Sequence, residues 1–179
     1  KNRKDFIRPV YCIDGNHEDF LNIEILTKRY QEHFTYLGRG DTHEIEGYNF
    51  LSFGGSAYMD PINTPPGAVI RAEDIKKSIL QNCKKIDIVI SHDCPMGIGV
   101  PGTPGFEYCG PTGFKNGLSL LKHFKPKIWF FAHYHKWFSV YVGQTRFLGV
   151  GLARDGFVLL RDDFSAEIIN LPINNKKPK

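Results

Sequence analysis

Residues 86–92 are Ile86-Asp87-Ile88-Val89-Ile90-Ser91-His92, a run of β-branched residues that ends in a histidine. Branched side chains pack well on a pleated surface, so this run predicts a buried strand. The same pattern occurs twice more along the chain. Pro9–Ile13 leads to His17, and Lys127–Phe131 leads to His133. We therefore predict three buried strands, each of which places an imidazole just beyond its carboxyl end.

Helical segments separate these strands, and plain strands close the chain. We expect helices over residues 19–34, 72–84 and 116–124, with Asp19 as the cap of the first. A hairpin-like stretch and four antiparallel strands are expected over residues 35–53, 137–142, 145–150, 156–161 and 166–171. This order of elements predicts an α/β layered domain with a mixed sheet or two packed sheets. In such folds, functional sites form at the carboxyl ends of the strands.

Two stretches rich in glycine and proline, residues 55–70 and 93–113, predict loops. A loop as long as the second is uncommon in a compact domain unless it has a function. Because it follows His92, we expect it to overhang the edge where the histidines gather. Its glycines would cradle a phosphate there, and Phe106 and Tyr108 would stack on a base or ring. A plain connecting loop is the alternative interpretation.

The 179 residues are enough for one domain, which we assign to residues 1–173 with a polar tail over residues 174–179. Lys and Arg number 23 and Asp and Glu 19, and much of the resulting charge of +4 lies at the two ends. A nucleic-acid-binding groove is therefore not indicated. No apolar run is long enough to cross a bilayer, so we expect no membrane contact.

The four cysteines, Cys12, Cys83, Cys94 and Cys109, form no CxxC pair. A cysteine zinc site is therefore not expected. Because no signal peptide opens the sequence, we expect free thiols and a cytoplasmic location.

The histidines that follow the strands suit a metal centre. A lone histidine at such a place is usually structural, but three strands that each deliver one favour a site. Imidazole suits Zn, Mn, Fe and Ni, and the amide of Asn16 would add a harder ligand. His133 and His135 would both face the site only if the backbone leaves ideal pleating, and could then reach two ions about 3.5–4 Å apart. We expect Gly15 to allow the tight turn that aims Asn16 and His17.

Three short segments resemble the motifs of the calcineurin-like metallophosphoesterase superfamily. Gly15-Asn16-His17-Glu18 resembles its GNH[DE] motif, and Ser91-His92 resembles its isolated histidine after a strand. Ala132-His133-Tyr134-His135 resembles its GHxH motif, with Ala132 where glycine is usual. Order and spacing agree over residues 9–170. Within the superfamily, residues 91–95 and 125–135 are similar to the lariat-debranching branch and to uncharacterised prokaryotic phosphoesterases.

The resemblance implies a layered β-sandwich flanked by helices and a role for each matching residue. Asn16, His92 and His133 would bind one metal ion, and His135 would bind a second. His17 would contact the phosphate and act as the general acid. The implied reaction is hydrolysis of a phosphodiester or phosphomonoester by metal-activated hydroxide at two divalent ions, Mn, Fe, Zn or Ni. The substrate would be a phosphorylated small molecule or a nucleic acid.

Two motifs of the superfamily, DxH and GD, have no counterpart before Gly15, so the domain is expected to lack its first βαβ segment. Gly40-Asp41-Thr42-His43 is a weak substitute, because it lies after the GNHE motif in a polar hairpin where Asp41 suits a turn. We favour a C-terminal portion of a longer enzyme, with the missing ligands on a longer chain. A partner chain, or a catalytically inactive scaffold or protein-binding module, are the alternatives. Retention of His17 argues against a scaffold.

Other residues near the motifs have less definite predictions. Asp93 either orients the loop that follows it or is an ordinary turn residue. Tyr134 is expected to point away from the ligand pair if its segment is extended. Arg39 is expected to be solvated rather than a phosphate clamp, and Cys94 is not expected to bind metal.

Overall fold

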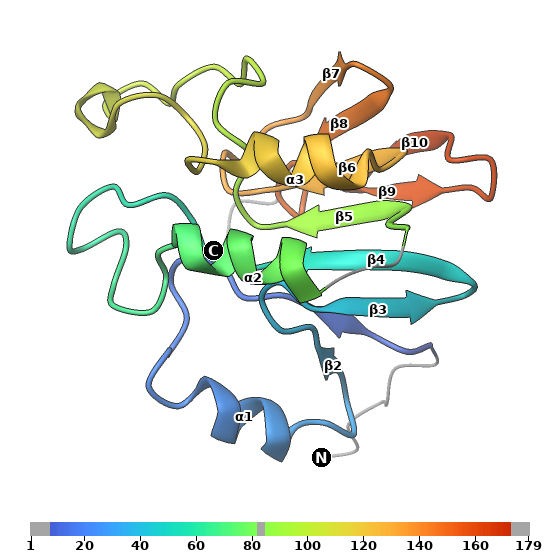
Figure 1. Cartoon of the computed structure of the whole chain (residues 1–179), viewed down its shortest axis with the longest axis horizontal. Coiled ribbons are helices and arrows are strands. Elements are labelled where there is room, and N and C mark those ends of the chain that lie inside the picture. The colour runs from blue at the N-terminus through green and yellow to red at the C-terminus, as the bar shows by residue number, and fades with distance from the viewer. Residues whose placement is uncertain (1–7, 82–84, 173–179) are drawn as a thin grey trace.

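The computed structural model describes residues 8–81 and 85–172. A mixed sheet of six strands in the order β3-β4-β5-β6-β8-β7 forms its centre (Figure 1). These strands are β3 (Thr42–Ile45), β4 (Tyr48–Phe53), β5 (Ile88–Ser91), β6 (Ile128–Phe131), β7 (Phe138–Val142) and β8 (Thr145–Gly149). Two smaller ribbons pair β1 (Tyr11–Cys12) with β2 (Thr35–Tyr36) and β9 (Gly156–Leu160) with β10 (Ala166–Asn170). The helices are α1 (Ile23–Arg29), α2 (Ala72–Gln81), α3 (Gly117–Phe124) and the short 3₁₀ turn η1 (Glu107–Cys109).

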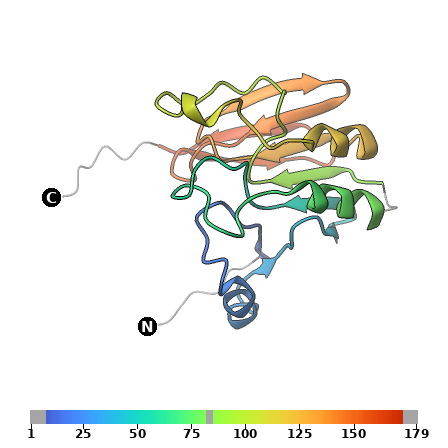
Figure 2. The same ribbon diagram turned by 60° about the vertical axis from the view of Figure 1, so that its left-hand side comes forward.

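The four central strands of the sheet, β4, β5, β6 and β8, run parallel. Their carboxyl ends therefore meet at one edge. The loops of residues 55–70 and 93–113 both lie beyond that edge, on the left of Figures 1 and 2. The α/β layered architecture is confirmed, and the buried runs of residues 86–91 and 127–131 form the central strands β5 and β6 as predicted. The prediction of a third buried strand over residues 9–13 is wrong: only Tyr11–Cys12 is a strand, Tyr11 is 42% exposed, and the strand pairs with β2 outside the main sheet.

The core lies between the sheet and helices α2 and α3. Leu51, Val89 and Trp129 from three adjacent strands pack there with Ile75 of α2 and Leu120 of α3. The opposite face of the sheet is partly covered by the β9–β10 ribbon. The Phe164 ring meets the Tyr48 ring edge-on, and Arg146 Nη1 donates a hydrogen bond to the Ala166 carbonyl. The expected second sheet is thus a two-stranded ribbon.

The first helix is shorter than the pattern of residues 19–34 predicts. It covers only Ile23–Arg29, and none of those residues is buried. Leu21 is 93% and Ile25 63% exposed, so packing does not stabilise further turns. Asp19 is not the cap; Asn22 occupies that position. The predicted end of the second helix at residues 82–84 and the polar tail of residues 174–179 lie outside the described residues.

The β3–β4 hairpin contains the Gly40-Asp41-Thr42-His43 stretch. Glu46 and Gly47 form its turn with φ of 50° and 82°, the left-handed pair typical of a tight hairpin. Asp41 is exposed and its backbone N–H donates to the Gly38 carbonyl, as expected for a turn residue.

No helix among the described residues is both long and apolar enough to span a bilayer.

Candidate metal centre

Three ligand atoms from distant parts of the chain converge at the carboxyl edge of the sheet. His92 Nε2 lies 2.9 Å from Asn16 Oδ1 and 3.1 Å from His133 Nδ1. The three residues follow β1, β5 and β6 closely in the sequence. The structure therefore brings together the three residues that the resemblance implies as ligands of one metal ion.

Parallel pairing places the two histidines side by side. β5 and β6 are hydrogen-bonded neighbours, and the ladder continues one step past their ends, where the Ala132 N–H donates to the His92 carbonyl at 3.0 Å. On the other side, the His92 N–H donates to the Phe53 carbonyl at 3.1 Å. His92 is thus held by strands on both sides before its ring reaches the site.

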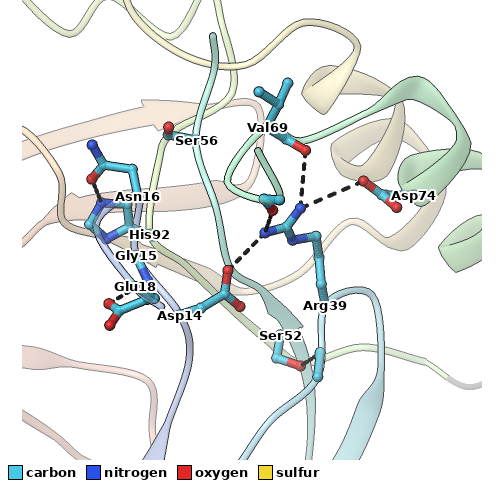
Figure 3. Close-up of polar contacts among 12 residues, drawn as sticks. Asp14, Gly15, Asn16, Glu18, Arg39, Ser52, Ser56, Val69, Asp74 and His92 are labelled. Atoms are coloured by element: carbon cyan, nitrogen blue, oxygen red, sulfur yellow. Dashed lines mark hydrogen bonds and ion pairs between the residues drawn. The ribbon is translucent and has the colours of Figure 1, made fainter. Parts of the chain in front are cut away.

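The Asn16 amide is oriented by one backbone carbonyl. Its Nδ2 donates a hydrogen bond of 2.7 Å to the Asn63 carbonyl, which leaves Oδ1 facing His92. Figure 3 shows the Asn16 amide against the His92 ring. Asn16 is only 5% exposed, so this orientation is fixed by burial as well. The atom presented to the site is the oxygen, which is the atom of an amide that can bind a cation.

Gly15 matters for a reason other than the one predicted. Its φ lies outside the left-handed region, so no glycine-specific turn is present. A β-carbon there would instead lie 3.1 Å from Cε1 of His92 and 3.2 Å from Oε1 of Glu18. Glu18 Oε1 also accepts a hydrogen bond from the Gly15 N–H at 3.1 Å. Glycine therefore allows the loop to approach the His92 ring closely.

The segment that carries the last two histidines leaves the pleat, as expected for two ligands two residues apart. His133 and His135 have φ of 55° and 53°, in the left-handed region that residues other than glycine rarely adopt. Between them, the Tyr134 N–H donates to the Ala132 carbonyl at 2.6 Å. Strained backbone of this kind persists where the surrounding structure enforces it, and it is frequent at functional sites.

Burial keeps the two converging imidazoles neutral. Loss of hydration lowers the pKa of His92 to about 4, and the adjacent His133 acts in the same direction. Burial also lowers the pKa of His133 below its usual range. Neutral imidazole retains the lone pair that a metal ion needs, so both rings are in the ligating form at neutral pH.

The convergent set fits one metal ion but does not complete its coordination. Two ligand atoms at about 2.1 Å from one ion are about 3.0–3.4 Å apart, close to the spacing here. Among the described residues, no group of three or more His, Cys, Asp or Glu side chains could hold a metal ion. The set has two imidazoles and an amide oxygen. It therefore lacks the carboxylate that its resemblance leads one to expect.

Asp14, two residues before Asn16, does not supply that carboxylate. The Tyr36 hydroxyl donates to its Oδ1 and Arg39 Nη2 donates to its Oδ2, each at 2.8 Å. Arg39 also donates to the carbonyl of Val69 (Figure 3) and to that of Gly67. The expectation that Arg39 is solvated is wrong: its side chain is 17% exposed and clamps the loop of residues 13–16 to that of residues 67–69. No sequence pattern pairs two residues 25 apart.

A cavity of about 380 Å³ opens beside the three converging atoms. Its wall includes His17 and His135, which are both exposed, together with Asn16 and His133. Much of the remaining wall comes from the long loop, through residues 102–104, 106–107 and 109–113. The prediction that this loop overhangs the site is therefore confirmed.

The two aromatic residues predicted to bind substrate have different places. Phe106 lines the cavity, whereas Tyr108 does not. The Tyr108 hydroxyl donates to Asp60 Oδ2 at 3.1 Å, and its ring stacks on Phe106 with 6.0 Å between centroids. Cys94 is fully buried in the core, and burial raises the pKa of its thiol, as expected for a residue that does not bind metal.

Comparison with known proteins gives a consistent result. The sequence profile of the calcineurin-like phosphoesterase family matches residues 1–137. A lariat debranching enzyme from Entamoeba histolytica is 28% identical over 165 residues, covering 78% of this chain and 46% of the enzyme. The chain thus spans about half the length of that curated relative. One solved crystal structure superposes with a TM-score of 0.62 at 15% identity, over 89% of this chain and 65% of the other, which shows a shared fold.

Proposed function

The chain belongs to the calcineurin-like phosphoesterase family, and from that membership we propose that it hydrolyses a phosphodiester or phosphomonoester at a centre of two divalent metal ions. One observation carries the proposal. His92 Nε2 lies 2.9 Å from Asn16 Oδ1 and 3.1 Å from His133 Nδ1, and Asn16 and His133 line a cavity. A buried trio of neutral ligands has no evident use in packing alone.

In this proposal Asn16, His92 and His133 hold one ion, and His135 contributes to the second. Divalent ions bound at such a centre lower the pKa of water and neutralise charge on a phosphate. Nitrogen and oxygen ligands of this kind accept Mn, Fe, Zn or Ni. The carboxylate that would complete the centre comes from a segment outside this chain or from a partner, which agrees with the 46% coverage of the relative.

His17 is the proposed general acid. It follows the ligand Asn16 directly, yet its side chain is exposed on the cavity wall rather than packed among the ligands. An imidazolium there can donate its N–H proton to the leaving oxygen of a substrate in the cavity. A scaffold that only binds a partner would have no use for a histidine in this position.

The cavity wall supports a substrate with an apolar or aromatic group next to its phosphate. Phe106, Met59 and Pro104 line it, and Tyr108 supports Phe106 from outside. Among the described residues that line this cavity, none is Lys or Arg, and Glu107 adds a carboxylate. A phosphorylated small molecule therefore suits the cavity better than a long nucleic acid, whose many phosphates would need cations.

The proposed compartment is the cytoplasm. Cys12, Cys94 and Cys109 are free thiols, which supports a reducing environment.

The decisive experiment compares two leaving groups. The longer protein or complex that supplies the missing carboxylate, freed of metal with EDTA and then given Mn²⁺, is assayed with 4-nitrophenyl phosphate, phenyl phosphate and bis(4-nitrophenyl) phosphate. We expect Mn²⁺-dependent hydrolysis. His17→Ala should lower turnover of phenyl phosphate by about 10²–10⁴-fold, with a smaller loss for 4-nitrophenyl phosphate, because 4-nitrophenolate leaves more easily without a proton. Mn²⁺ affinity, measured by calorimetry, should stay nearly unchanged.

His123→Ala is the matched control, because His123 is an exposed histidine on α3 away from the cavity lining. It should leave both activity and Mn²⁺ affinity intact. Equal turnover of phenyl phosphate by wild type and His17→Ala would overturn the role of His17. Tight Mn²⁺ binding by the wild type without any turnover would favour the scaffold alternative.

A further inference from the structure

Asp93 is a buried carboxylate beside the candidate ligand His92, yet it binds none of the converging atoms. It is fully buried, and three donors from three segments satisfy it. The Ala57 N–H donates to Oδ2 at 2.8 Å, and the Cys94 N–H and the Tyr134 hydroxyl donate to Oδ1 at 2.7 and 2.8 Å. A buried carboxylate with this many donors is fixed in place.

Tyr134 lies between His133 and His135 in the sequence and connects their segment to the Asp93 carboxylate. Its ring meets the His133 ring edge-on, with 4.9 Å between centroids and 80° between planes. Its hydroxyl, besides donating to Asp93, accepts a hydrogen bond of 2.8 Å from the Gly113 N–H. The sequence predicts that Tyr134 points away from the ligand pair only in an extended segment; the segment is not extended, and the Tyr134 side chain lines the cavity.

Gly113 lies at the closed base of the long loop. The neighbouring Phe114 N–H donates to the Cys94 carbonyl at 2.8 Å, and the Met96 N–H donates to the Phe114 carbonyl at 3.0 Å. Gly113 itself has φ of 97°, and a β-carbon there would lie 2.6 Å from the Cys94 carbonyl oxygen. The hydroxyl of Tyr134 therefore holds the place where the loop returns to the sheet.

We propose that Asp93 and Tyr134 are positioning residues that form a latch, which fixes the strained histidine segment and couples it to the loop wall of the cavity. The left-handed conformations of His133 and His135 need an outside restraint. The Tyr134 hydroxyl supplies one midway between them. The proposal goes beyond the proposed function, and only its metal-binding consequence rests on that function.

Tyr134→Phe tests the latch, because it keeps the ring against His133 and removes only the hydroxyl. In the metal-free protein, we expect faster hydrogen exchange at the Gly113 amide, measured by NMR. Mn²⁺ affinity, measured by calorimetry, should fall about tenfold, the lower end of the range for lost support of a ligand. Tyr48→Phe is the matched control, since that hydroxyl also donates to a carboxylate, Asp162 Oδ1 at 3.4 Å, but lies outside the cavity lining. It should change neither quantity.

Asp93→Asn gives a second test. An amide nitrogen at either oxygen position would face an N–H or O–H donor. Hydrogen exchange at the Gly113 amide should therefore be faster, and Mn²⁺ affinity lower, than in Tyr134→Phe. If this variant does not fold, Tyr134→Phe still decides. Unchanged Gly113 exchange and Mn²⁺ affinity in Tyr134→Phe would overturn the latch. If the wild type binds no Mn²⁺, the proposed function fails, whereas Gly113 exchange still shows whether the hydroxyl anchors the loop.

Discussion

The Gly15 α-carbon lies against the His92 ring, and the absence of a side chain there sets how far the loop can approach. The loop carries Asn16, whose Oδ1 must come within 2.9 Å of His92 Nε2. The ring cannot easily move aside, because its Nε2 also contacts His133 Nδ1 at 3.1 Å. The geometry of the candidate centre thus depends on a residue that supplies no ligand atom itself.

Gly15→Ala is expected to weaken Mn²⁺ binding about tenfold by displacing the His92 ring. The new β-carbon would lie 3.1 Å from Cε1 and 3.3 Å from Nδ1 of that ring, closer than ordinary contact. Calorimetric titration with Mn²⁺ measures the effect. Gly102→Ala is the control, because a β-carbon at Gly102 has no neighbour within 4 Å. Equal affinity in the two variants would contradict the proposed close approach.

At the scale of elements, the β1–β2 ribbon that carries the Asn16 loop is separate from the main sheet in strand pairing. Hydrogen bonds join the residues after its strands to the segment after β4: the Gly55 N–H donates to the Asp14 carbonyl at 3.2 Å, and Arg39 donates to the Val69 and Gly67 carbonyls. In Figures 1 and 2 this ribbon and α1 lie below the sheet. Arg39 also binds the Asp14 carboxylate, so it ties the loop after β1 to the segment after β4.

Arg39→Met should lower the free energy of unfolding by about 3 kcal/mol, because it leaves the buried Asp14 carboxylate without its charged partner. Urea denaturation followed by fluorescence measures this loss. Arg161→Met is the matched control: Arg161 pairs with Glu167, but both side chains are about half exposed, so its removal should cost less than about 1 kcal/mol. Similar losses in both variants would show that the clamp contributes no more than a surface pair.

For the molecule as a whole, the candidate centre exists only in the folded chain. Asn16, His92 and His133 are separated by 76 and 41 residues. An unfolded chain does not hold these three atoms together, so an ion that binds them stabilises the native state.

Saturating Mn²⁺ is therefore expected to raise the melting temperature, and EDTA should reverse the rise. At a free concentration 100 times the dissociation constant, the gain is about 2.7 kcal/mol. Differential scanning calorimetry measures the shift. In Asn16→Ala, which removes one ligand of the trio, the shift should shrink, whereas in His123→Ala it should match the wild type. A full shift in Asn16→Ala would place the ion elsewhere.

The sequence alone determines the central strands and the identity of the candidate ligands. Runs such as Ile88–Ser91 and Ile128–Phe131 form strands because local shape and apolarity favour them wherever they pack. A histidine placed just after such a run lies at the carboxyl end of the strand that the run forms, as His92 and His133 do after β5 and β6. Strands and the polar residues that follow them can therefore be predicted from short stretches of sequence. The structure brings Asn16, His92 and His133 together as expected.

Only the tertiary structure decides what supports those ligands. The Arg39–Asp14 clamp and the Tyr134–Asp93 hydrogen bond join residues 25 and 41 apart. The Asn16 amide is oriented by a carbonyl 47 residues away. Glycine is needed at position 15 because the His92 ring lies close to it, and not because the backbone turns there. Helix α1 is short because none of its residues is buried against another element. These features depend on which surfaces meet after folding, and no local pattern encodes the partner of a charge, a hydroxyl or an apolar face.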